Sequence, residues 1–531
     1  MWYDETTMET ITSRDPATGE TLGQIPQTPL DQIPVLVAQA RAAQQAWSQL
    51  SPKDRMPYFI NAREHILDNI DSIAELISRE NGKPRFEAMV NDIIPTLDLL
   101  TQYAKRAPKL LKDQPIPMRI MKHRKSYLHF WPKGVVAIIA PWNFPFSIPL
   151  GEIALALMAG NAVIFKPSEV TPLIGRKIVE IFEHACLPKH LLQLVVGDPS
   201  RGAALVKAKL DKIFFTGSVA TGKKVMAAAS ETLTPVVLEL GGKDPMVVMP
   251  DADIDFATSA ALWGGFANSG QVCASTERVI VHESIHDQFV NTLKSKVGKL
   301  RHGGHLGEGD LGVATYEKQK EIYAHQLAEL SKDNSSILHG GKFSKDHTFL
   351  EPTIVTNPPG QSGNPIEKTK IYQEETFGPV VAVTKFKTTQ EAIEKANDTK
   401  YGLLASVISK DVAMAEQLAK KIEAGSVLIN EVLYTHGLAE TPWGGVKDSG
   451  FGRVHSDLGF LEFVNVRHIH KPKWWAPLFK SLWWFPYTPH QTQMFRKFAE
   501  VMFRRSLTRR LKALPDLIVA FTQMIKTEKR L

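Results

Sequence analysis

Cys273 and Glu239 are the residues of this sequence best suited to chemistry on a carbonyl group. Cys273 lies in the run GQVCAST and is one of only two cysteines in 531 residues. Glu239 lies 34 positions upstream, among apolar residues and glycines. A thiolate can attack a carbonyl carbon, and a carboxylate can activate the water that later hydrolyses the thioester. A lone cysteine is more often a small core residue, so this prediction depends on the accompanying residues.

Two further polar groups follow short apolar runs typical of buried strands. Asn143 follows the run 135–140, and its side-chain N–H could hold a developing oxyanion; it could equally belong to a proline-bracketed turn. Lys166 and Glu169 follow a second such run and could hold the sugar hydroxyls of a nucleotide. A solvated turn is the alternative for this pair.

A third and a fourth candidate turn carry small or acidic residues. Gly217 and Ser218 precede a helical segment, where backbone N–H groups could approach a pyrophosphate, although a glycine-rich turn alone is weak evidence. Glu375 and Phe377 precede a tight turn, and here a helix-capping acid and a core phenylalanine are the alternatives. Ligands bind outside the carboxyl ends of parallel strands, so several such turns in one sheet favour a binding site.

The elements that must position these residues alternate between strand and helix. Residues 31–110 have the apolar spacing of helices, and strands and helices alternate from 134 onward. The alternation pauses near Gly241 and then restarts, which predicts a second domain because the chain is too long for one core. The strands are expected at 135–140, 162–165, 191–196, 212–215, 236–238, 247–248 and 278–281.

The sequence motifs resemble those of the NAD(P)-dependent aldehyde dehydrogenase family. They occur in family order from about Asp15 to Val466, and each alone is only moderately specific. The matching motifs are PWNFP at 141–145, KPSE at 166–169, FTGS at 215–218, LELGG at 238–242, GQVCAST at 270–276, EETFGPV at 374–380 and PWGGVKDSGFGR at 442–453.

The resemblance implies a mechanism and a set of roles. Cys273 attacks an aldehyde carbon, the Asn143 amide holds the oxyanion, and Glu239 activates water to hydrolyse the thioester. Lys166 is counted with these catalytic residues as well as with the nucleotide site, and no metal is expected. The cofactor-binding residues implied by the resemblance are Trp142, Lys166, Glu169, Gly217, Ser218, Glu375 and Phe377.

The resemblance leaves the cofactor and the substrate partly open. Glu169 favours NAD, because its carboxylate would repel a 2′-phosphate, although NADP is possible. Glu239 favours acid formation over transfer to coenzyme A. Ser147 and Gly151 stand where many relatives have bulkier side chains, which predicts a wider tunnel and a medium-chain, long-chain or bulky apolar aldehyde. A coenzyme A-acylating enzyme and a non-catalytic membrane-binding scaffold are the alternatives.

Composition separates a mildly acidic body from a basic tail. The residues after 465 contain 14 Lys and Arg against 3 Asp and Glu, whereas the rest contains 49 against 53, so the overall net charge of +7 comes from the tail. The basic balance therefore does not indicate a nucleic-acid-binding protein. Two cysteines fit a reducing compartment, and the acidic N-terminus lacks a signal-peptide pattern. A cytoplasmic protein is expected, possible membrane contact being peripheral.

The tail departs from the family pattern and is rich in aromatic residues. Basic residues and an apolar stripe at helical spacing follow its tryptophans, a pattern typical of a helix lying in a membrane surface across 474–514. Docking on the body or on a partner subunit is the alternative. The tryptophans and the stripe are Trp474, Trp475, Trp483, Trp484, Phe503, Leu507, Leu511 and Leu514.

The fold class expected is α/β, with two Rossmann-like parallel-sheet domains, a small β oligomerisation element and a C-terminal helical tail. The resemblance implies a homodimer or a homotetramer. The expected boundaries are 1–118 with 133–242 for the cofactor domain, 243–436 for the catalytic domain, 119–132 with 437–466 for the oligomerisation element, and 467–531 for the extension.

Overall fold

The structure is a computed structural model that describes residues 9–303, 309–330, 336–345, 347–357, 365–476, 481–485 and 487–527. The chain divides into two compact units. One contains Met1–Asp113 and His129–Arg467, and the other contains Gln114–Leu128 and His468–Leu531. The first unit holds every residue of the expected active site.

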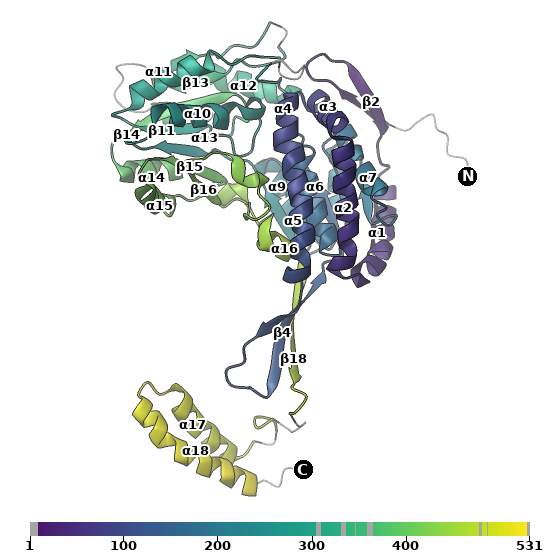
Figure 1. The fold of residues 1–531 in the computed structure, drawn as a ribbon, viewed down its shortest axis with the longest axis vertical. Helices are drawn as coiled ribbons and strands as arrows, with labels where there is room; N and C mark the ends of the chain where they lie inside the picture. The colour runs from purple at the N-terminus through teal and green to yellow at the C-terminus, as the bar shows by residue number, and fades with distance from the viewer. Residues whose placement is uncertain are drawn as a thin grey trace, which may run out of the picture. The chain divides into compact units, whose positions relative to one another are not determined.

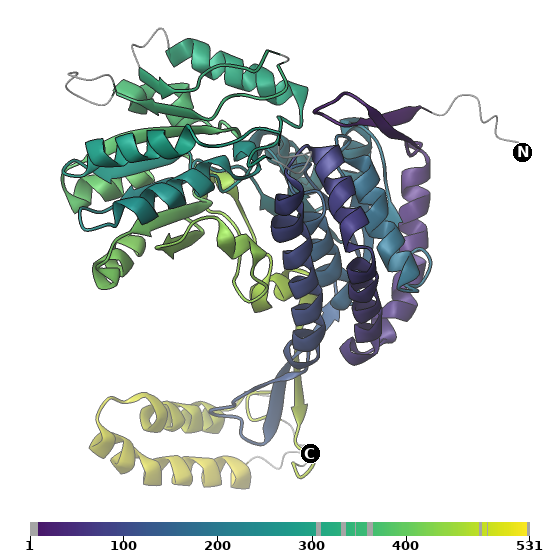
Figure 2. The same cartoon turned by 45° about the horizontal axis from the view of Figure 1, so that its top comes forward.

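A helical layer opens the first unit, as the sequence predicts. A capping box at Ser51 starts the second helix, and Gly82 ends the third in the left-handed conformation. Helices α2 and α5 pack side by side, and α5 lies against α6 (Figures 1 and 2). The elements are β1 Thr10–Arg14, β2 Thr21–Pro26, α1 Gln32–Gln49, α2 Pro52–Asp68, α3 Ile70–Asn81, α4 Arg85–Glu87, the π-helix η2 Ala88–Ile93 and α5 Ile94–Leu110.

A six-stranded sheet in the order β17-β9-β8-β5-β6-β7 follows, and all its strands except β17 run parallel. Chain order reverses between β5 and β8, so the loops after these strands flank the crevice where open α/β sheets bind ligands. Its elements are β5 Val135–Ile139, α6 Ser147–Met158, β6 Ala162–Lys166, α7 Pro172–His184, β7 Leu192–Leu194, α8 Pro199–Val206, β8 Lys212–Thr216, α9 Val219–Ser230, β9 Val236–Glu239 and β17 Gly450–Phe451.

A seven-stranded sheet, β12-β13-β14-β11-β10-β15-β16, forms the second domain of this unit, with only β12 antiparallel. Its strands are β10 Pro245–Val248, β11 Arg278–His282, β12 Ser336–His339, β13 Thr353–Thr356, β14 Val380–Phe386, β15 Leu404–Ile408 and β16 Ser426–Ile429. Its helices are α10 Ile254–Phe266, η3 Ala267–Gly270, α11 His286–Val297, α12 Glu317–Leu330, η5 Pro365–Lys368, α13 Lys370–Gln373, α14 Thr389–Asn397, α15 Val412–Ala419, η6 Tyr434–Gly437 and η7 Lys447–Ser449. A further helix, α16 Ser456–Glu462, packs against α6 of the first sheet. The α/β fold with two parallel-sheet domains is thereby confirmed.

The second unit contains a small sheet and a helical hairpin. The sheet has the order β18-β4-β3, and α17 packs against α18 (Figure 1). Within the described residues, no helix is long and apolar enough to cross a membrane. The elements are β3 Gln114–Ile116, β4 Arg124–Pro132, β18 Val464–Pro472, α17 Pro489–Phe503 and α18 Leu507–Thr527.

The last strand of the small sheet lies mostly after the expected second segment, 437–466. This strand, β18, runs to Pro472, beyond the expected start of the extension. The whole of the expected segment belongs to the first unit, where Gly450 and Phe451 pair with the end of β9.

Candidate active site

The loop between β5 and α6 holds Asn143 at the switch point of the first sheet. The Asn143 carbonyl accepts hydrogen bonds from Lys83 Nζ at 2.8 Å and Asn268 Nδ2 at 3.0 Å. Its side-chain Nδ2 donates to the Gln271 carbonyl at 3.1 Å. An amide NH₂ has two hydrogens, so one remains for a further acceptor such as an oxyanion.

A buried ion pair holds this loop in place. Lys83 Nζ lies 2.7 Å from Asp92 Oδ2, and neither side chain has solvent exposure. The other Asp92 oxygen accepts from the backbone N–H groups of Phe146 and Ser147, at 3.3 and 3.0 Å. Asp92 lies in the π-helix η2, a geometry common at functional sites. The pair therefore joins the helical layer to the start of α6.

The loop that carries Cys273 has an unusual backbone. Asn268, Ser269 and Gly270 in succession have positive φ, a conformation that costs free energy for the two residues with side chains. The Glu87 carboxylate offsets this by accepting the Asn268 N–H at 2.9 and 3.0 Å. The Gln271 side chain donates to the Asn268 carbonyl, so the turn is held from both ends.

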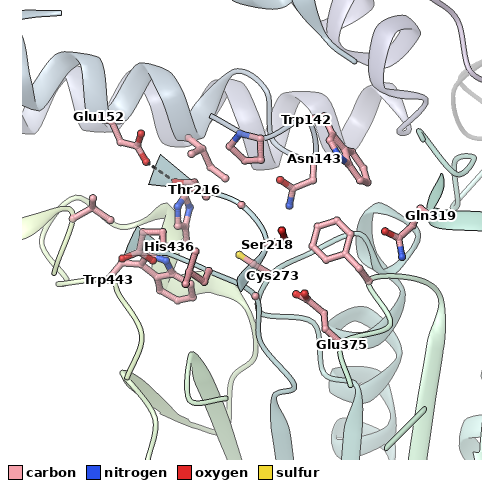
Figure 3. Close-up of a pocket in the computed structure, with 18 of the residues that line it drawn as sticks. Trp142, Asn143, Glu152, Thr216, Ser218, Cys273, Gln319, Glu375, His436 and Trp443 are labelled. Atoms are coloured by element: carbon pink, nitrogen blue, oxygen red, sulfur yellow. Dashed lines mark hydrogen bonds between the residues drawn. The ribbon is translucent and has the colours of Figure 1, made fainter. Parts of the chain in front are cut away.

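Cys273 lines two cavities. Figure 3 shows residues of the first of them. The first cavity, about 210 Å³, is lined by charged and polar groups that include Asn143, Glu152, Glu239 and Glu375. Burial, together with Asp244, Glu239 and Glu375, raises the pKa of the Cys273 thiol above its usual range.

The second cavity, about 80 Å³, contains no Asp, Glu, Lys or Arg in its lining. Burial lowers the pKa of His436 to about 4, so this imidazole is neutral near pH 7. The cavity is therefore uncharged. Its lining is Val90, Asn91, Pro95, Phe144, Ile148, Trp263, Ala267, Val272, Cys273, Ala274, Leu433, Tyr434, His436, Gly437 and Trp443.

Glu239 ends β9 and faces the first cavity. The residue is buried, and neither carboxylate oxygen makes a hydrogen bond of ordinary geometry. Burial raises the pKa of this carboxyl to about 8, although Arg453 and the Trp443 indole favour its charged form. A carboxyl with a pKa near neutrality is suited to general-base work. Gly444 makes room for it, because a Cβ there would lie 2.9 Å from Glu239 Oε1.

Most of the sequence-predicted site residues line one cavity, and two do not. Lys166 and Glu169 lie together at the end of β6, with 3.8 Å between Nζ and Oε2, outside the cavity that holds Cys273. A direct part for Lys166 in the chemistry stays a prediction that this placement does not favour. The predicted residues that line the first cavity are Trp142, Asn143, Gly217, Ser218, Glu239, Cys273, Glu375 and Phe377.

That Ser147 and Gly151 widen a substrate tunnel stays a prediction. Neither lines a cavity beside Cys273, whereas Ile148 lines both. A Cβ on Gly151 would lie 2.9 Å from Leu99, so this glycine accommodates the packing of α6 against α5.

Sequence reasoning also missed residues that the fold brings to the cavity from distant positions. They are Glu152, Thr216, His436 and Trp443. Glu152 had a usable signal, since it is the one charged residue in the apolar run of α6.

Comparison with known proteins agrees with this geometry. The model of the Aldehyde dehydrogenase family matches residues 2–469. The chain belongs to the aldehyde dehydrogenase family. A 4,4'-diapolycopene aldehyde oxidase from Methylomonas sp is 37% identical to it, across 93% of this chain and 92% of that protein. The chloroplastic betaine aldehyde dehydrogenase of Atriplex hortensis is 34% identical, across 88% and 94%.

Solved structures of this family share the fold. The betaine aldehyde dehydrogenase of Staphylococcus aureus in complex with NAD⁺ superposes with a TM-score of 0.83 at 31% identity, covering 90% of this chain and 96% of that one. An NAD⁺ complex of an aldehyde dehydrogenase from Bacillus cereus gives the same TM-score at 31% identity, covering 87% and 93%.

Lys83→Met is expected to lower the free energy of unfolding by about 3–5 kcal/mol, because it leaves the Asp92 charge buried without a partner. Urea unfolding followed by tryptophan fluorescence measures the change. Lys177→Met is the matched control, since Lys177 pairs with Glu180 at the surface and its loss should cost about 1 kcal/mol or less. Equal effects of the two substitutions would contradict a structural role for the buried pair.

Proposed function

We propose that this enzyme oxidises an apolar aldehyde to the carboxylic acid with NAD⁺. The observation that carries the substrate class is the second cavity beside Cys273, whose lining holds aromatic and aliphatic groups and no formal charge. Such a lining favours an apolar chain, because buried apolar area drives binding and unpaired polar groups would lose their hydration. The first cavity serves the cofactor, and Cys273 stands between them.

The residues of the first cavity fit a dinucleotide. Ser218 caps α9, with its hydroxyl accepting from Thr221 N, and the first turn of that helix offers N–H groups to a pyrophosphate. Gly217 leaves no room for a side chain, since a Cβ there would lie 2.7 Å from the Phe215 ring. Glu169 next to Lys166 favours NAD over NADP by repelling a 2′-phosphate. Bound NAD⁺ would supply the hydride acceptor.

The protein's own groups account for the remaining steps. The Cys273 thiol loses its proton and its sulfur bonds to the aldehyde carbon, while the Asn143 amide and the Cys273 N–H hold the oxyanion. Loss of hydride from that carbon leaves a thioester. Glu239 then takes a proton from water, the hydroxyl adds to the carbon, and the C–S bond breaks to release the acid.

The relatives point to two substrate classes. Betaine aldehyde carries a quaternary ammonium group, whose recognition uses aromatic faces and is strengthened by nearby negative charge. The second cavity has aromatic side chains and no carboxylate, which supports the apolar class. The length of the match supports it too. The match to the diapolycopene aldehyde oxidase covers 93% of the 531 residues, about 494, and only 472 residues precede Lys473, so this match includes part of the tail. The betaine aldehyde dehydrogenase match spans 88%, about 467.

We also propose that the second unit binds an anionic membrane surface. Helix α18 presents two apolar faces: one packs on α17 around Met494, Ala520 and Met524, and the other is exposed. The exposed stripe repeats every three or four residues along the helix. It comprises Leu507, Leu511, Leu514, Ile518, Phe521 and Ile525.

Charge and aromatic side chains favour a lipid surface over a protein partner. Arg504, Arg505 and Arg509 are exposed at the turn into α18, where they could contact anionic headgroups. Four exposed tryptophans precede the hairpin, and this residue type concentrates at membrane interfaces. An enzyme for a membrane-dissolved apolar aldehyde would meet its substrate there.

We propose further that the enzyme forms a homodimer or a homotetramer. Strand β18 forms one edge of the small sheet, and an open edge is a template for pairing with another chain.

With NAD⁺ and no coenzyme A, kcat/KM should rise with the chain length of unbranched aldehydes. Each methylene that becomes buried contributes at most about 0.8 kcal/mol, roughly fourfold. NADH absorbance and acid product measure turnover, and Cys273→Ser is the inactive control. A steady fall with chain length, or a preference for betaine aldehyde, would contradict the apolar class. A requirement for coenzyme A would favour the acylating alternative, and no NADH with any aldehyde would favour the scaffold.

The full-length protein should float with vesicles containing anionic phosphatidylglycerol and less with pure phosphatidylcholine. The double substitution Leu511→Glu with Ile518→Glu should abolish flotation, because it puts charges in the exposed stripe. Leu67→Glu, on an exposed apolar position of α2, is the matched control and should float normally. Failure of the wild type to float, or equal flotation of the stripe variant, would overturn the membrane proposal. A changed oligomer mass without vesicle binding would indicate protein docking instead.

A further inference from the structure

Glu152 is a buried carboxyl that the reaction described so far leaves unused. It lies in α6, all of whose residues are buried, and it lines the cavity that also holds Glu239 and Cys273. Its Oε1 accepts a hydrogen bond from the Thr216 hydroxyl at 3.2 Å, shown in Figure 3, whereas its Oε2 has no hydrogen-bond partner. Glu152 is therefore a buried carboxyl with one oxygen available to a further hydrogen-bond donor.

Two buried glutamates outside this cavity are fully partnered. Both oxygens of Glu80 are bonded, accepting from Ser13 and from the backbone of Leu173 and Ile174, and both oxygens of Glu87 accept from Asn268 N. A carboxyl that serves only structure needs such partners, because an unsatisfied buried polar group costs about 1–3 kcal/mol. Glu152 departs from this pattern at the one place where protons must move.

The charges that face Glu152 favour its protonated form. Burial, and then repulsion from Glu239 across the cavity, raises the pKa of Glu152 well above its usual range, while the Thr216 hydroxyl lowers it. Tyr103 of α5 faces it from the other side and is itself held neutral by burial. Repulsion between two carboxyls that line one cavity disfavours the ionisation of both, so it favours a state in which one of them keeps its proton.

A route to solvent continues from Glu152. Thr216 ends β8 and is half-buried, and two residues later Ser218 is exposed. Both line the same cavity. Glu239, by contrast, is buried, and neither of its carboxylate oxygens has a hydrogen-bond partner of ordinary geometry.

We propose that Glu152 relays the proton that Glu239 takes from the hydrolytic water and passes it by way of Thr216 toward solvent. The proposal rests on the proposed hydrolysis of a Cys273 thioester. The water hydroxyl adds to the acyl carbon, the C–S bond breaks, and the sulfur leaves as a thiolate. The water's proton moves to Glu239 and then to Glu152, as the proton already on Glu152 leaves through the Thr216 hydroxyl. Glu152 acts through Glu239 and does not touch the acyl group.

Glu152→Gln should leave the first-turnover burst of NADH intact and slow the steady state by roughly 10²-fold, because hydride transfer precedes the relay. The dependence of the steady-state rate on pH distinguishes the loss of the relay from a packing defect. Wild-type hydrolysis should rise with pH as Glu239 loses its proton and level off above its pKa of about 8, whereas the variant should keep rising because hydroxide must remove the proton. Glu152→Asp should restore part of the steady-state rate.

Glu80→Gln is the matched control, since it replaces a buried carboxyl outside the cavity and should leave the burst and the pH profile unchanged. A Glu152→Gln enzyme with wild-type steady-state rate and pH profile would overturn the relay. So would loss of the burst together with the steady state, which would assign Glu152 to the folding of the site. Absence of NADH formation by the wild type with any aldehyde would refute the proposed function itself, so the two failures are distinguishable.

Discussion

The burial of acidic groups around Cys273 is the constraint on which the rest of the site depends. A thiol and three carboxyls, those of Glu152, Glu239 and Glu375, line one cavity, and burial raises the pKa of each. Charges interact strongly in such a space because little solvent screens them. The free enzyme therefore favours the neutral, protonated forms of the Cys273 thiol and of these carboxyls. A cation that enters the cavity would favour the thiolate by the same physics.

Backbone N–H and C=O groups buried around the cavity need hydrogen-bond partners from the protein itself. The loops that carry Asn143 and Cys273 make few of the hydrogen bonds of a regular strand or helix. Side chains from the helical layer supply hydrogen-bond partners instead. Lys83 and Asp92 serve the oxyanion loop, and Glu87 serves the strained turn at Asn268. The helical layer is thus part of the active site, although none of these three side chains touches a substrate. This dependence explains why irregular backbone persists beside the nucleophile.

The sequence predicts the groups that stand at strand ends and fails where distant segments meet. Asn143, Gly217 and Glu239 follow recognisable strands, and parallel strands bring their ends to one edge. Glu152 and His436 reach the same cavity through the rotation of α6 and the path of a late loop, which local patterns do not encode. The same rotation places Ile148, and not Ser147 or Gly151, in the cavity lining. In the tail, helical spacing predicts the stripe only to Leu514, because a proline follows, yet α18 continues through Pro515 to Thr527.

The most direct test of this account is the alkylation rate of Cys273 by iodoacetamide as a function of pH, in a Cys186→Ser background without cofactor. Cys186 is the only other cysteine and is exposed, so its removal isolates the signal. Burial among carboxyls predicts slow alkylation at pH 7, with a rate that still climbs at pH values above the usual pKa of a thiol, about 8.5. Rapid alkylation at pH 7 with a midpoint below neutrality would contradict the account.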